Sequence, residues 1–334
     1  MKHRWRPLLF FLAIIALGVL ILSRIGQLQS FVATIKGVNI WLLLLVIPLR
    51  YAYYWANTWY FSSFFRLFEA PQERKHLFRT VVATNFVNII VPTAGVSGLS
   101  YMRESIGRKV KSSILTLSHL GYYILGLTAG LALFTMSFAV LLVSNQVVRV
   151  SARLLLLAMF VLLCGIVVGL VLLLNRKLSI ETILWLSRPL NWVLHKIHRR
   201  PVTRVRVETF LNDAGDNLNF LRQNWHGLDK PFAALLLMLL LDILSLYIVA
   251  VSFGRILNPA VVISSYFLAQ LGSLASVFTA GVGAFEAVLA ASLVGFGVPF
   301  DVAFPITIVY RGISFWGFLP VGLWYYKRGV LDGK

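Results

Sequence analysis

The stretch VPTAGVSG at residues 91–98 recurs later in the chain as VFTAGVGA at residues 277–284, with Thr-Ala-Gly-Val identical in both copies. Each copy interrupts an apolar segment at a point where a membrane helix does not ordinarily break. A broken backbone leaves N–H and C=O groups without intrahelical partners, so hydrocarbon tolerates it only where protein or water covers it. Apolar segments interrupted by Gly or Pro in corresponding halves of a chain indicate the binding site of a transporter.

The composition is that of an integral membrane protein. Of the 334 residues, 59% are hydrophobic and 13% are charged, and the mean hydropathy is +0.82. Soluble domains are closer to half apolar and about a quarter charged. The net charge of +19 comes mainly from Lys and Arg between apolar runs. Such residues act as topology signals, which favours a membrane protein over a nucleic-acid-binding one.

The cysteine content argues against a metal or disulfide framework. Cys164 is the single cysteine of the sequence, and it lies inside an apolar run. It therefore forms no intramolecular disulfide, and the chain has no Cys/His spacing typical of metal sites. We expect no metal and no cofactor.

The distribution of Lys and Arg predicts six full transmembrane helices with both termini in the cytoplasm. The basic N-terminus precedes an apolar run without a cleavage site, which predicts an uncleaved signal anchor at residues 7–23. The other spans are predicted at residues 38–62, 112–143, 154–174, 232–253 and 302–326. The run 112–143 exceeds the roughly 20 residues that a span needs. It is either one tilted helix or a span followed by a short interfacial piece.

The two interrupted segments are predicted to be re-entrant hairpins. If residues 80–102 crossed the membrane, the cations that follow would lie outside, which the positive-inside bias disfavours. A hairpin from the cytoplasm keeps them inside, with Pro92 breaking the helix and Gly95 and Gly98 permitting the turn. The same reasoning makes residues 263–296 a hairpin that enters from outside. The halves then run in opposite senses, as an inverted-topology repeat.

Residues 1–334 are predicted to form a single, all-α polytopic membrane domain with one polar insert. The insert, residues 175–231, carries ten Lys and Arg against five Asp and Glu, so we expect it in the cytoplasm. Its second half has apolar residues at helical spacing, which predicts an amphipathic helix. This basic segment either lies in the membrane interface or folds as a helical pair under the bundle.

Ionisable side chains within the apolar segments are candidate functional residues, because a charge at bilayer depth costs about 2.5 kcal/mol or more. Glu286 and Arg311 are predicted to form an ion pair or to line a wet cavity at the second hairpin. The alternative is a structural pair that fixes this hairpin. Arg103 either captures a lipid phosphate at the cytoplasmic mouth or snorkels as a topology anchor. Three further candidates lie within predicted spans: Arg50, His119 and Asp242.

At these positions the sequence resembles the lysylphosphatidylglycerol synthase transmembrane family, a flippase-like domain of bacterial and archaeal membrane proteins. Residues 88–98, NIIVPTAGVSG, resemble its Asn-x-x-x-Pro-x-x-Gly-x-x-Gly block, and GVGAFE at 281–286 resembles its Gly-x-Gly-x-x-Glu. Tyr310-Arg311 matches a late Tyr-Arg pair, and the resemblance covers about residues 5–328. Two departures, Ala94 in place of a frequent glycine and Phe278 in place of proline, affect hairpin shape more than charge.

The resemblance implies a lipid transporter that moves a phospholipid or a polyprenyl-linked lipid between leaflets. The hairpins are then expected to meet near the midplane. The residues expected to line the headgroup path are Asn88, Pro92, Gly95, Gly98, Arg103, Gly281, Gly283, Glu286 and Arg311. The sequence has no part resembling the family's aminoacyl-transferase domain, and it lacks the common phosphate-loop, zinc-protease and serine-hydrolase motifs. We therefore expect no enzymatic activity.

Two other functions stay open at this point. The protein is alternatively an accessory subunit that presents lipid to a separately encoded cytosolic transferase through its basic insert. A third alternative is an ion or small-solute transporter on the same repeat, against which lateral openings toward lipid would argue. The expected partners are anionic or amphiphilic membrane lipids and no nucleic acid, and the sequence does not define an oligomeric state. The expected location is the plasma (inner) membrane of a prokaryote.

Overall fold

The computed structural model of the chain describes residues 37–93, 95–106, 110–144, 212, 216, 219–276 and 281–332, and these residues are helical without any strand. The predicted spans 7–23 and 154–174, and most of the insert 175–231, lie outside the described residues. The all-α prediction is therefore confirmed for the part of the chain that the structure describes.

The first half of the described chain consists of a long helix, a helical hairpin and a second long helix. These are α3 (Ile40–Leu67), α4 (Arg74–Ile90), α5 (Val96–Ile106) and α6 (Ser112–Val143). Asn39 caps α3, because its Oδ1 accepts hydrogen bonds from the backbone N–H groups of Trp41 and Leu42. The 32 residues of α6 form one uninterrupted helix, which decides between the two alternatives for residues 112–143.

The second half repeats this order. It contains η3 (Trp225–Leu228), α10 (Asp229–Ser252), α11 (Pro259–Ala275), α12 (Ala284–Gly295), α13 (Phe300–Arg311), η5 (Gly312–Trp316) and α14 (Phe318–Asp332). The element η5 is a π-helical turn, in which the N–H of Gly317 donates to the carbonyl of Gly312 at 2.7 Å. It joins α13 to α14.

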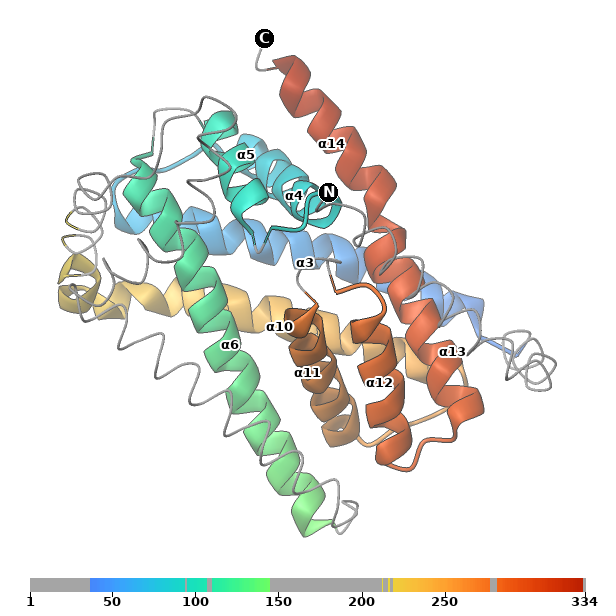
Figure 1. Cartoon of the computed structure of the whole chain (residues 1–334). Coiled ribbons are helices and arrows are strands. Elements are labelled where there is room, and N and C mark those ends of the chain that lie inside the picture. The colour runs from blue at the N-terminus through green and yellow to red at the C-terminus, as the bar shows by residue number, and fades with distance from the viewer. Residues whose placement is uncertain are drawn as a thin grey trace, which may run out of the picture.

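Helices α3 and α10 pack against each other along their lengths and run antiparallel (Figure 1). The N–H of Asn39 donates to the carbonyl of Ser252 at 2.9 Å, which ties the start of α3 to the end of α10. The last long helix of each half packs on the hairpin of the other half: α6 packs along α11, and α14 packs along α4.

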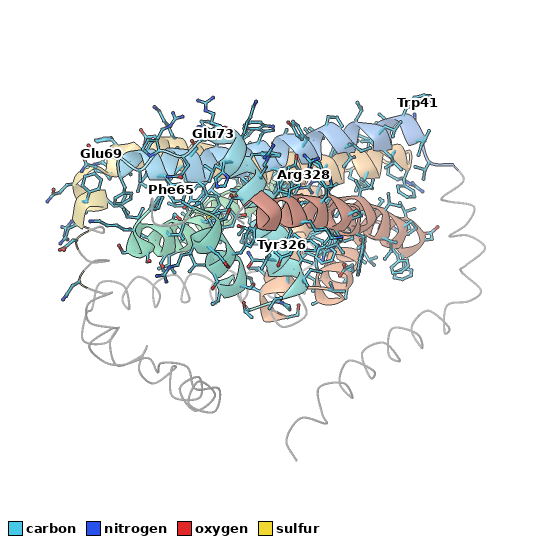
Figure 2. The ribbon with its side chains drawn as sticks, turned by 90° about the horizontal axis from the view of Figure 1, so that it is seen from above. Trp41, Phe65, Glu69, Glu73, Tyr326 and Arg328 are labelled. Atoms are coloured by element: carbon cyan, nitrogen blue, oxygen red, sulfur yellow. The ribbon has the colours of Figure 1, made fainter. Side chains whose placement is uncertain are left out.

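Two main clusters of buried apolar side chains form the core, and each includes residues of both halves: Ala234 of α10 joins the cluster around α3, and Val46 of α3 joins the cluster around α10. One gathers around α3, α4, α5 and the start of α6, and includes Tyr60, Phe64 and Met102. The other gathers around α10 to α13 and includes Leu289 and Ile306. Figure 2 shows α3 running from Trp41 to Phe65 along one edge of the molecule, with Tyr326 of α14 in the next layer.

Polar contacts join the helices where they cross. The hydroxyl of Tyr60 on α3 donates to the carbonyl of Ser118 on α6 at 2.7 Å. The hydroxyls of Ser137 on α6 and Ser264 on α11 lie 2.8 Å apart and share a hydrogen bond. In a membrane such bonds and close packing hold helices together, because lipid tails are as apolar as the helix surfaces.

Three described helical segments are long and apolar enough to cross a membrane: Ser112–Val143, Trp225–Ser252 and Phe300–Gly329. The helix α3 is also long, at 28 residues, but Arg50 and its many Tyr and Trp side chains lower its hydropathy. The arms of the second hairpin, α11 with 17 residues and α12 with 12, are shorter than the roughly 20 residues of a full span. Six full spans and re-entry of the hairpins stay predictions.

Candidate functional site

The second hairpin and α13 form the ion pair expected from the sequence. The Nε of Arg311 donates to Oε1 of Glu286 at 2.7 Å, and the two side chains are only 12% and 16% exposed. The other carboxylate oxygen of Glu286 accepts the N–H of Gly283 at 2.7 Å, which closes the first turn of α12. Glu286 thus both caps α12 and neutralises Arg311.

Arg311 is held by aromatic rings as well as by its carboxylate partner. Its guanidinium lies over the ring of Phe285 at 4.5 Å and over the ring of Phe315 at 4.2 Å. Cation–π contacts of this kind fix the orientation of an arginine. Its Nη2 is buried and has no hydrogen-bond partner among the described residues. The π-helical turn follows Arg311 directly, and such turns are frequent at functional sites.

The glycine-containing breaks of the two hairpins have closely related geometry. Gly95 has φ +89° and Gly281 has φ +75°, values at which residues with a side chain are strained. A Cβ at Gly95 would overlap the hydroxyl of Tyr123, and a Cβ at Gly281 would overlap the hydroxyl of Ser273. The glycine of each tetrapeptide therefore has a backbone conformation typical of a tight turn, while residues 94 and 277–280 lie outside the described residues.

The remaining motif residues of the first hairpin hold its two arms together. The side-chain oxygen of Asn88 on α4 accepts the N–H of Gly98 on α5 at 2.8 Å and the hydroxyl of Ser97 at 3.2 Å. A Cβ at Gly98 would crowd the Asn88 amide, at about 2.5 Å. Pro92 lies in the break between α4 and α5, where α4 has already ended. These contacts stabilise the hairpin itself.

Arg103 and His119 lie apart from the ion pair of the second hairpin. Arg103 is exposed on α5, which packs on α4 and α6, whereas Glu286 and Arg311 lie between α12 and α13. His119 is buried on α6, where its Nδ1 donates to the carbonyl of Leu115 at 3.1 Å. The described residues contain no group of three His, Cys, Asp or Glu placed to hold a metal ion.

A second buried charge cluster joins four helices. The Nη1 of Arg50 on α3 donates to Oδ1 of Asp242 on α10 at 2.5 Å. The same oxygen accepts the hydroxyl of Tyr310 on α13 at 2.7 Å, and Oδ2 accepts the hydroxyl of Tyr266 on α11. The side-chain amide of Gln270 donates to the Tyr266 oxygen at 2.5 Å. The sequence marks Arg50 and Asp242 only as isolated charges in apolar segments, and it carries no signal that pairs them.

This charge cluster lies about a third of the way along α3, which has 28 residues, and near the middle of α10, which has 24. Arg50 is ten residues from the start of α3, and Asp242 is ten residues from the end of α10. Because the hydrogen bond between Asn39 and Ser252 joins those two ends, both charges lie about 15 Å from the same edge, at 1.5 Å per residue.

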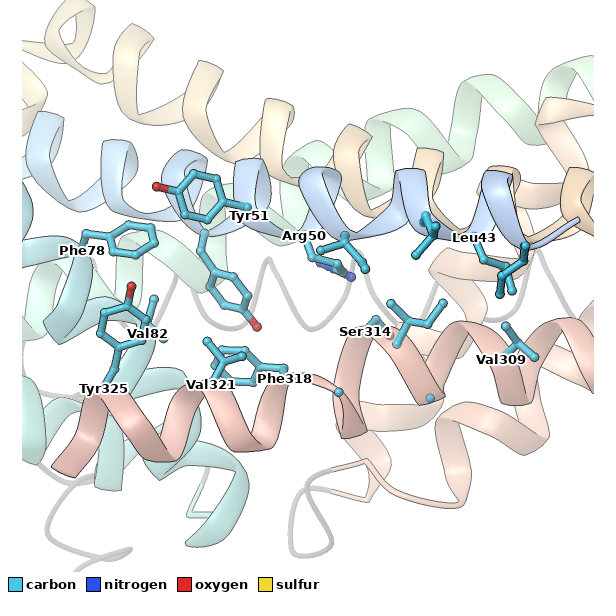
Figure 3. Close-up of a pocket in the computed structure, with 17 residues that line it drawn as sticks. Leu43, Arg50, Tyr51, Phe78, Val82, Val309, Ser314, Phe318, Val321 and Tyr325 are labelled. Atoms are coloured by element: carbon cyan, nitrogen blue, oxygen red, sulfur yellow. The ribbon is translucent and has the colours of Figure 1, made fainter. Parts of the chain in front are cut away.

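A groove of about 750 Å³ runs beside Arg50, between α3, α4 and the continuous helix α13–η5–α14 (Figure 3). Its walls are mainly apolar: Leu43 on α3 lies across from Val309 on α13 (Figure 3), and Ile47 and Val321 also line it. Arg50 is the one charged residue among the described residues that line it. Several lining side chains, including Ile47 and Val321, are exposed, so the groove opens at the protein surface.

The long apolar helices, the buried ion pairs and the surface-open apolar groove define an all-helical membrane protein. The chain belongs to the family described as the lysylphosphatidylglycerol synthase TM region, whose family profile matches residues 8–322. The family resemblance read from the hairpin motifs is thereby confirmed.

One curated relative is a UPF0104 membrane protein of Methanothermobacter thermautotrophicus, which is 36% identical over 99 residues. The matched segment spans 30% of this chain and 30% of that relative. No solved structure matches the chain.

Proposed function

We propose that this protein moves an amphiphilic membrane lipid, either a phospholipid or a polyprenyl-linked lipid, from one leaflet to the other. The observation that carries the proposal is the Arg50–Asp242 cluster, buried between α3 and α10 and bordered by an apolar groove that opens at the surface. A transported lipid needs both features, because its headgroup requires polar contacts at the midplane while its chains stay in an apolar environment.

The correspondence of the two halves supports transport by an inverted-topology repeat. Each half has a long helix, a hairpin broken at a glycine with positive φ, and another long helical segment. The packing corresponds as well: α3 pairs with α10, and α6 covers α11 as α14 covers α4. Antiparallel equivalent helices are expected when two halves insert in opposite senses, as in many alternating-access transporters.

The second hairpin supplies a candidate headgroup contact. Arg311 keeps a buried Nη2 without a described partner while Glu286 neutralises its charge. We assign Arg311 and Glu286 to the headgroup path, together with the glycine and Asn88 motif that shapes the hairpins. Arg103, exposed on α5, is assigned to a separate contact with lipid phosphate at the cytoplasmic end. A plasma-membrane location with both termini in the cytoplasm and the absence of enzymatic activity belong to the same proposal.

The surface-open groove favours a lipid over an ion or a small solute, since a solute path is walled off from the bilayer whereas a lipid must exchange with it. The basic insert, on which an accessory role with a cytosolic transferase would depend, lies largely outside the described residues.

A reconstitution assay tests the proposed transport. The purified full chain is placed in liposomes that contain fluorescent lipids with several headgroups, and an impermeant quencher reports which leaflet each lipid occupies. Wild-type protein is expected to equilibrate at least one lipid between leaflets. Arg311→Ala and Glu286→Ala are expected to lose this activity.

Two further variants make the assay decisive. The double variant Arg311→Gln/Glu286→Gln removes both charges together, so it leaves no unpaired buried ion and protects the fold. Arg328→Ala removes an exposed cation of α14 and is expected to keep wild-type activity. Folded wild-type protein that moves none of the lipids would refute the proposal. Full activity in the double variant would remove Arg311 and Glu286 from the headgroup path.

A further inference from the structure

We propose that the groove between α3, α4 and α13–η5–α14 binds a lipid with an anionic headgroup. The headgroup phosphate contacts Arg50, and a hydrocarbon chain lies along the apolar wall. The inference rests on the proposed lipid transport and names its substrate class. It adds a binding site on the opposite side of α13 from the ion pair of the second hairpin, built from residues that the hairpin motifs do not include.

The dimensions of the groove suit a hydrocarbon chain. Its volume of about 750 Å³ falls within the roughly 300–1,000 Å³ of ligand pockets. Its lining follows α3 from Ile40 to Tyr54, which is about 21 Å at 1.5 Å per residue. One leaflet contributes about 15 Å, half of the hydrocarbon core, so the groove is long enough for a chain beside a headgroup.

The hydrogen bonding around Arg50 favours an anionic headgroup. Asp242 accepts from Tyr310 and Tyr266 as well as from Arg50, so two hydroxyls share its negative charge. A guanidinium has five N–H donors, and only one of those of Arg50 is bonded to Asp242. Its Nε is buried, but the side chain is 12% exposed and lines the groove, so its other N–H groups are the donors available there. Arg50 therefore retains donors for a second anion.

The surroundings of Arg50 orient it for that role. Its guanidinium lies over the ring of Tyr53 at 4.3 Å, which limits the directions in which it can turn. Arginine binds phosphate through two parallel N–H donors, and charge-assisted bonds of this type are about twice as strong as neutral ones. A zwitterionic lipid offers the same phosphate, but its cationic group meets no carboxylate among the described residues that line the groove, since Asp242 is not one of them.

Gly312 allows the groove to be filled without disturbing the fold. It lines the groove, has a helical backbone with φ −53°, and has no heavy atom within 4 Å of a built Cβ. Gly312→Leu therefore places a side chain in the space that the lipid chain would occupy. Gly126 on α6 is also helical with open space around its Cβ, and it does not line the groove. Gly126→Leu is the matched control.

The test uses the full chain in nanodiscs that contain a phosphatidylglycerol or a phosphatidylcholine analogue with a diazirine in its acyl chain. After irradiation, labelled peptides are mapped by mass spectrometry. The phosphatidylglycerol analogue is expected to label residues 40–54 and 309–325 about tenfold more than the phosphatidylcholine analogue, as one charge-assisted contact predicts. Gly312→Leu is expected to reduce labelling by either analogue severalfold, and Gly126→Leu to leave it unchanged.

The variant Arg50→Gln/Asp242→Asn tests the headgroup contact without leaving one buried charge unpaired. It is expected to abolish the preference for phosphatidylglycerol while circular dichroism stays that of the wild type. Equal labelling by both analogues, or a preference that survives in this variant, would overturn the inference and leave only annular lipid at the groove.

Measuring leaflet exchange on the same samples separates the two proposals. Exchange without selective labelling would overturn the groove site alone. Selective labelling without exchange would support the groove site and overturn transport.

Discussion

Removal of the Asp242 carboxylate is expected to destabilise the protein more than removal of its partner Arg50. Asp242→Ala leaves a buried guanidinium unpaired, which costs about 3–5 kcal/mol. It also removes the acceptor of the Tyr310 and Tyr266 hydroxyls. Interhelical hydrogen bonds in membrane proteins average about 0.6 kcal/mol, so the two together add about 1.2 kcal/mol. Arg50→Ala leaves a carboxylate that still accepts hydrogen bonds from both tyrosines. Its cost in unfolding free energy therefore does not include the contribution of those two bonds.

The order of the two variants is measured by unfolding the protein in mixed micelles with increasing dodecyl sulfate, with the helical circular dichroism signal as readout. Asp301→Ala, at an exposed position in the first turn of α13, is the control and is expected to stay within about 0.5 kcal/mol of the wild type. Equal costs for both variants, or a greater cost for Arg50→Ala, would refute the hydrogen-bond accounting. So would a cost for Asp242→Ala below about 1 kcal/mol.

Two further predictions concern glycines and use the same unfolding assay. Gly95→Ala is expected to cost about 1–3 kcal/mol because of its φ of +89°, and Tyr123→Phe in the same chain should recover part of it by removing the overlapping hydroxyl. Strictly additive effects would contradict that overlap. On α6, Gly130→Ala should cost about 1–3 kcal/mol because its Cβ would lie 2.8 Å from the ring of Phe267. Gly126→Ala, with open space, should instead stabilise by about 0.5–1 kcal/mol, and equal effects at the two positions would contradict the packing described for α6.

The hairpins and one ion pair could be predicted from the sequence because the patterns that indicate them are local. A repeated Thr-Ala-Gly-Val marks both breaks, and the glycine of each adopts a positive φ. Glu286 lies on the first turn after the second break, and Arg311 ends a helix that packs directly on it. Charge in an apolar segment is rare enough that two such residues in neighbouring helices predict each other as partners.

The Arg50–Asp242 cluster and the groove depend on packing between distant helices, which no local sequence pattern encodes. Arg50 and Asp242 are 192 positions apart, and they meet only because α3 and α10 run antiparallel in a particular register. The groove is assembled from single faces of α3, α4 and the last helix, each of which reads as ordinary lipid-facing surface in the sequence. The π-helical turn at Gly312–Trp316 is likewise invisible, because its five residues differ in no clear way from those of an α-helix.

That π-helical turn lies at the point where the last helix passes from contacts with the second half of the molecule to contacts with the first. A π turn holds an additional residue, which rotates the following segment by about 100° relative to a continuous α-helix. Tyr310, before the turn, bonds to Asp242 within the second half, whereas Phe318, after it, stacks on Tyr54 of the first half at 4.5 Å. Helices bend most readily at π turns, so the last helix would bend here if one half rocked against the other. Because Arg311 is the turn's neighbour in the chain, such a motion would reposition the cation of the second hairpin at the same time.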